Sequence, residues 1–103
     1  MKTIKIMGKR IKIEKTDLLK SDGCLGDFDG DKKLIRIHKD LTGDDEREAI
    51  LHESLHAILF YSGVAFAIKD DDLEEAVVRA LEYNLPDVLK ELNKKPRKKR
   101  CDS

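Results

Sequence analysis

The sequence AILHESLHAILF, residues 49–60, determines how the rest of this chain must be arranged. Its apolar residues extend over more than three helical turns. Helix signals flank it, with an acidic stretch after Thr42 and a stop at Gly63. On a helix, His52 and His56 are four residues apart and share a face, so both imidazoles can reach one metal ion. The segment is apolar on almost every side, which predicts a helix at the centre of a small domain.

Glu53 lies one step round this helix, where its carboxylate can accept a proton from water that the metal activates. Polar groups in an apolar helix cost free energy unless they have partners. We therefore interpret the H-E-x-x-H pattern as a metal site, rather than as a core helix with carbonyl-bonded histidines. A catalytic zinc usually has three protein ligands and a water, so a third ligand must come from elsewhere. His38 is a candidate, but its position is more typical of a surface strand residue.

The N-terminal part of the chain has the alternation of β-strands. Residues 3–14 predict two short strands with a turn at Gly8-Lys9, because four isoleucines face one way and lysines the other. Residues 24–28 and 34–38 predict a second strand pair around a turn at residues 29–31. Residues 16–23 suit a short helical turn followed by a loop.

A second helix is predicted over residues 70–92 by a stripe of apolar residues. Pro86 removes one backbone hydrogen bond there, so we expect a kink or a restart. The pattern ends after Asn93. Packed antiparallel to the first helix, this helix brings Glu74 and Glu75 beside the two histidines, and either could be the third ligand.

Composition restricts the class of protein. The chain has 103 residues, enough for one domain, which we assign to residues 1–93, followed by a disordered basic tail at residues 94–103. Lysine plus arginine and aspartate plus glutamate both number 21, so no net charge attracts the molecule to nucleic acid, although the tail could contact it. Two distant cysteines and the lack of a signal peptide or a long apolar run predict a cytoplasmic protein that does not enter the membrane.

Four segments, in this order, resemble a known family: residues 25–29, 34–37, 49–58 and 74–81. The chain is similar to the small zincin-like metallopeptidases, which are encoded largely by bacteriophages and mobile elements and are distantly similar to the ImmA/IrrE type. The resemblance covers roughly residues 3–92. Its H-E-x-x-H part is specific, whereas its strand part is weak alone.

The resemblance implies the roles of the site residues. Zn²⁺ would be bound by two histidines and a downstream glutamate, His52, His56 and Glu75, with Glu53 as the general base. The facing of the second helix favours Glu74, but the spacing typical of glutamate-type zincins favours Glu75. We predict Glu75, with Glu74 as the alternative and manganese, iron or nickel as alternative metals.

These observations together predict an α+β, minimal zincin-like fold, with a small, mostly antiparallel sheet packed on two main helices. The expected function is zinc-dependent hydrolysis of peptide bonds in a protein or peptide substrate, which would add to a sheet edge at residues 34–38. Arg79, one turn after Glu75, is expected to hold that carboxylate. The alternatives are a non-enzymatic module that zinc stabilises and a regulator that contacts nucleic acid through its basic tail.

Overall fold

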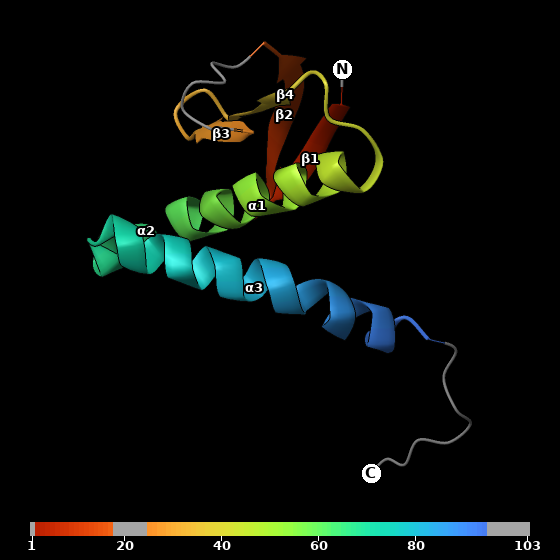
Figure 1. Ribbon diagram of the computed structural model, residues 1–103. Coiled ribbons are helices and arrows are strands. Elements are labelled where there is room, and N and C mark those ends of the chain that lie inside the picture. The colour runs from red at the N-terminus through yellow and green to blue at the C-terminus, as the bar shows by residue number, and fades with distance from the viewer. Residues whose placement is uncertain (1, 18–24, 95–103) are drawn as a thin grey trace.

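The computed structural model describes residues 2–17 and 25–94, and it confirms the predicted α+β fold. Four strands are followed by three helices (Figure 1). Their bounds are β1 Lys2–Ile6, β2 Lys9–Thr16, β3 Gly26–Asp29, β4 Leu34–His38, α1 Gly43–Ser62, α2 Val64–Ile68 and α3 Asp71–Leu92. The predictions for residues 18–23, for both cysteines and for the tail after Lys94 lie outside the described residues.

The strands form one sheet in the order β1-β2-β4-β3. The β1–β2 and β3–β4 pairs are antiparallel hairpins, as predicted, and the β2–β4 pair is parallel. The prediction that residues 34–38 form the sheet edge is wrong, because β4 lies between β2 and β3. The parallel pairing of β2 with β4 displaces β3 outward, so β3 is one edge strand of the described sheet and β1 is the other. The spatial order of strands is not set by their sequence order.

Helix α1 lies between the sheet and α3 (Figure 1). On its sheet side, a cluster of buried residues forms the first core: Ile6, Ile11, Ile13, Ile35, Ile37 and Ala57. On its α3 side, Leu55 and Leu59 pack against Val78. Each fully buried aliphatic side chain contributes about 1.5–3 kcal/mol to folding. The two cores explain why α1 is apolar on almost every side.

The connection between the two long helices is short. Helix α1 ends at Gly63, which has a φ of 87° in the left-handed region that favours glycine. The five-residue helix α2, which the sequence pattern did not predict, follows directly. Asp70 then caps α3 by accepting hydrogen bonds from the backbone N–H groups of Asp72 and Leu73. This tight reversal places the first turns of α3 beside the last turns of α1.

Helix α3 continues through Pro86 to Leu92, so the expected restart does not occur. Proline removes only one backbone hydrogen bond, and its fixed φ is compatible with a helix. Within residues 2–17 and 25–94, none of the helices has both the length and the apolar character needed to span a bilayer.

Candidate metal centre

His52 and His56 lie one turn apart on α1, on the narrow face that neither core covers. Their ring centroids are 5.1 Å apart, and both side chains are half-buried. The 3.6-residue helical period therefore places two imidazoles side by side, as the H-E-x-x-H pattern predicts.

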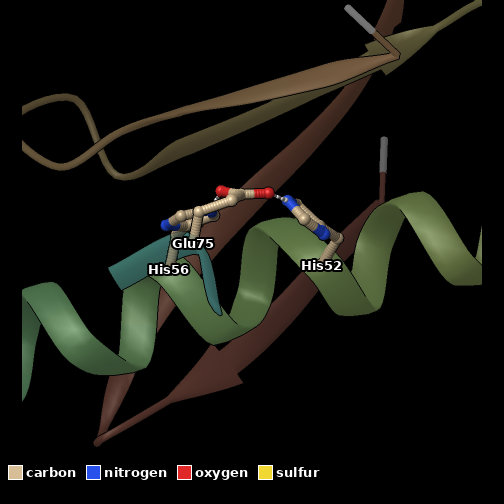
Figure 2. A group of neighbouring side chains, drawn as sticks. All are labelled: His52, His56 and Glu75. Carbon is tan, nitrogen blue, oxygen red and sulfur yellow. Dashed lines mark hydrogen bonds and ion pairs between the residues drawn. The ribbon is translucent and has the colours of Figure 1, made fainter. Parts of the chain in front are cut away.

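Glu75, from the second turn of α3, lies between the two imidazoles (Figure 2). One of its carboxylate oxygens, Oε2, is 3.1 Å from His52 Nε2, and the other, Oε1, is 3.1 Å from His56 Nε2. Two elements that are far apart in sequence thus bring three possible ligands together. Within the described part of the chain, these three residues offer ligand atoms that lie within 4.8 Å of one another.

The donor set suits zinc. Tetrahedral zinc with ligand distances of about 2.0–2.2 Å separates its ligand atoms by roughly 3.3 Å. Each Nε2 atom lies 3.1 Å from one of the two Glu75 oxygens, and ligand atoms taken one from each residue lie within 4.8 Å of one another. Two imidazole nitrogens and one carboxylate oxygen also match the three protein ligands of a catalytic zinc site, which leaves one position open.

The other nitrogen of each ring contacts a second acid from α3. Glu82 Oε1 lies 2.7 Å from His52 Nδ1, and Glu74 Oε2 lies 2.8 Å from His56 Nδ1. An ionised carboxylate can only accept, so each Nδ1 carries the proton. With Nδ1 held by Glu82 or by Glu74, Nε2 is the nitrogen of each ring that would bind a metal beside Glu75. Carboxylates commonly orient metal-binding histidines in this way.

These contacts differ between Glu74 and Glu75, the two glutamates that the sequence left as alternatives for the third ligand. Glu75 reaches both imidazoles at Nε2, whereas Glu74 contacts only His56, through Nδ1. Glu82 was not predicted. It lies seven residues, or two helical turns, after Glu75 and therefore shares its face, a signal that the sequence contained.

Arg79 supports Glu75 as expected, since its Nε donates to Glu75 Oε2 at 3.3 Å. Burial raises the pKa of the Glu75 carboxyl, but the hydrogen bond from Arg79 and the two nearby imidazoles outweigh burial. The net pKa of Glu75 is below its ordinary value, so this carboxylate is ionised and ready to bind a cation at neutral pH.

Glu53 is the most enclosed acid of the site, with 8% of its surface exposed. Burial raises the pKa of Glu53 above its ordinary value, and the imidazoles of His52 and His56 oppose this shift. A carboxylate with a raised pKa is well suited to accept a proton and return it. Among the described residues, its carboxylate forms no hydrogen bond.

The edge strand approaches α1 closely at Gly26. A Cβ atom on Gly26 would lie 2.9 Å from the carbonyl oxygen of Arg36 and 3.2 Å from Glu53 Cγ. Only glycine fits this space without a shift of its neighbours. No pattern in the sequence indicates this contact, which brings β3 against the candidate general base.

Two adjoining hollows open on either side of this group and share Gly26, His52, Glu53 and Glu75. We call the first, of about 510 Å³, the acidic hollow, because Asp45, Glu48 and Glu82 also line it. We call the second, of about 460 Å³, the aromatic hollow, after Phe28 and Phe60 in its wall. The three possible ligands are therefore accessible to a substrate.

The remaining candidates lie elsewhere. His38 is 4% exposed, so its assignment to the surface was wrong: Leu41 and the turn after β4 fold back over it. Its Nδ1 accepts from the backbone N–H of Asp40. The two tyrosines of the chain also lie apart from the centre: Tyr61 donates to the carbonyl of Gly30, and Tyr83 is exposed. Neither lines the two hollows.

Comparisons of the chain with protein-family models, curated proteins and solved structures found no match. The functional conclusion therefore depends on the geometry of the site and on the sequence pattern.

Replacing Glu82 with glutamine should weaken zinc binding by about 10–100-fold, because a neutral amide orients and polarises His52 less well. Competition with a chelating dye would measure the dissociation constant. A matched control is Glu91→Gln, which removes an acid from the same helix at an exposed position paired with Lys94. Equal affinities for the two variants would contradict the assigned role of Glu82.

Proposed function

We propose that this protein is a zinc-dependent peptidase that hydrolyses peptide bonds in a protein or peptide substrate. The observation that carries the proposal is the convergence of Glu75 on the Nε2 atoms of His52 and His56, beside the buried carboxylate of Glu53. The resemblance to small zincin-like metallopeptidases of phages and mobile elements supports the same conclusion.

Five residues of α1 and α3 would form the zinc site. His52, His56 and Glu75 would hold Zn²⁺, while Glu74 and Glu82 fix the imidazoles. When bound, zinc supplies Lewis acidity, which lowers the pKa of water to about 7 and polarises a carbonyl group.

Glu53 performs the proton transfers. Its carboxylate accepts the proton of the attacking water and then donates it to the nitrogen of the leaving amine. Burial of Glu53, which raises its pKa in the metal-free protein, favours the protonated form relative to an exposed acid and so supports both halves of this exchange. A zinc site with a purely structural role has no need for such a carboxylate, which is why we favour the enzyme over a zinc-stabilised binding module.

The substrate would lie along β3. This strand is a sheet edge, and its first residue, Gly26, lies against Glu53 and lines both hollows. An extended peptide can add to such an edge through backbone hydrogen bonds. We further propose a cytoplasmic site of action, in keeping with only two cysteines in the sequence.

Incubation of the protein with a mixture of peptides of known sequence tests the proposal. New peptide termini, detected by mass spectrometry, should appear with zinc, disappear with a chelator and return when zinc is restored. Zinc binding without new termini from any peptide would instead favour the non-enzymatic module.

A further inference from the structure

The two hollows beside the candidate metal centre have a strongly negative lining. Among the described residues, seven acids line them: Asp27, Asp45, Glu48, Glu53, Glu74, Glu75 and Glu82. The one base in the described part of their lining is Arg79. Seven carboxylates and one guanidinium give a formal charge of −6, and a bound divalent cation would leave −4. The metal therefore does not neutralise the lining.

Most of these acids already have partners. Glu74, Glu75 and Glu82 contact the imidazoles, and Asp27 is paired with Arg36 on the neighbouring strand. Asp45 and Glu48, by contrast, form no hydrogen bond or ion pair within the described part of the chain.

Asp45 and Glu48 are exposed, so water solvates both, but their positions bring two like charges together. They are three residues apart on α1, and Glu48 is four residues before His52, so the three side chains follow one face of the helix. Like charges at this spacing destabilise a helix. The helix dipole compensates for Asp45 in the first turn, but Glu48 lies beyond the first turn. A ligand of opposite charge would relieve the repulsion.

Two independent features of the same space also indicate a ligand. Glu53 is 8% exposed as a residue and lacks a hydrogen-bond partner among the described residues, yet it lines both hollows. In addition, Leu25, Leu41 and Ala49 provide an apolar wall in the acidic hollow. A lysine or arginine side chain combines a methylene stem, which packs on such a wall, with a cationic end.

We propose that the acidic hollow binds a lysine or arginine side chain, and hence that the substrate is a basic polypeptide segment. The residue on the other side of the scissile bond enters the aromatic hollow, where Phe28 and Phe60 favour an apolar side chain. The choice of substrate rests on the proposed peptidase function, whereas the binding of a basic segment does not.

Peptide binding to the zinc-loaded Glu53→Gln protein, which should not cleave, tests the inference. The probes are fluorescent octapeptides that differ at one central residue, which is lysine, norleucine or glutamate. Fluorescence anisotropy at low salt should show that the lysine peptide binds about tenfold or more tightly than the glutamate peptide. The preference should decrease as salt is added.

A charge-removing double variant, Asp45→Asn with Glu48→Gln, should weaken binding of the lysine peptide about tenfold and leave the norleucine peptide unchanged. Asp44→Asn is the matched control. It removes a charge from the same first turn, but Asp44 is absent from both hollows and faces Arg47.

The outcomes test the binding of a basic segment separately from the peptidase function. Selective binding of lysine peptides without cleavage by the unmodified protein would support the basic ligand and contradict the peptidase. Cleavage of peptides regardless of basic residues would support the peptidase and overturn the basic ligand. Equal binding of the three peptides, no binding of any, or equal effects of the double variant and Asp44→Asn would also overturn it.

Discussion

Replacing Glu53 with glutamine should lower the kcat/KM of peptide hydrolysis by about 10²–10⁴-fold, the usual contribution of a general base. Glutamine has nearly the same size but cannot accept and return the proton. The ligands His52, His56 and Glu75 are unchanged, so zinc affinity should be preserved. Initial rates on a cleaved peptide, together with zinc content per protein molecule, would measure both effects. Loss of zinc along with activity would contradict a purely chemical role for Glu53.

A control variant, Ser54→Ala, changes the next residue on α1. The Ser54 hydroxyl is buried and has no hydrogen-bond partner in the described part of the chain. Removing it should leave hydrolysis unchanged and should not lower stability. A similar loss of activity in both variants would mean that disturbance of the helix, and not loss of a proton acceptor, explains the result for Glu53.

The metal-free Glu53→Gln protein should also be more stable than the unmodified protein at neutral pH. Burial raises the pKa of Glu53 in the folded state above its value in the unfolded chain, which is about 4.3. Protonation of Glu53 therefore favours the folded state, and this contribution is fully present below the unfolded pKa. This stabilisation is lost as the pH rises through the raised pKa. Burying the ionised carboxylate at pH 7 therefore costs free energy, and the difference in melting temperature between the two proteins should shrink as the pH falls toward 4.

Zinc should stabilise the folded protein strongly, because the site joins α1 to α3. At a free zinc concentration about a hundred times the dissociation constant, the free energy of unfolding rises by about 2.7 kcal/mol. For a domain of this size that corresponds to roughly 10–20 °C in melting temperature. Glu75→Ala or His56→Ala removes one of three ligands and should abolish most of this shift. Thermal unfolding with zinc and with a chelator would measure it.

The control for this prediction is Asp87→Asn, which removes an exposed acid from α3 outside both hollows. It should retain the full zinc-dependent shift. If Glu75→Ala retained the shift as well, the imidazoles would bind zinc without α3, and the assigned ligand set would be wrong.

The sequence predicted the elements that have strong local signals. Alternating isoleucines identified β1 and β2, and the apolar period identified α1 and α3, because these patterns depend on neighbouring residues alone. The pair His52 and His56 follows from helical geometry, and the packing of two antiparallel helices predicts Glu74 or Glu75 beside them. The choice of Glu75 came from the spacing typical of glutamate-type zincins. These were the parts of the site that could be found without coordinates.

What the sequence missed depends on long-range arrangement. The edge strand was misassigned because the chain visits β3 before β4, while the parallel pairing of β2 with β4 leaves β3 outside. The burial of His38 depends on the turn that follows it. Glu82 could have been found by counting two turns from Glu75, but the close contact of Gly26 with Glu53 arises only when strand and helix are packed together.

In the part of the chain that the structure describes, the acids hydrogen-bonded to an imidazole of the centre all lie on helix α3: Glu74, Glu75 and Glu82. If α3 shifted by one turn along α1, all three contacts would be lost together, because the spacing of the three glutamates is fixed by the α3 backbone. Metal binding would therefore be coupled to the position of α3 on α1. A spin label or fluorophore at the C-terminal end of α3 would therefore respond to metal binding at its N-terminal turns. A chelator should reverse that response.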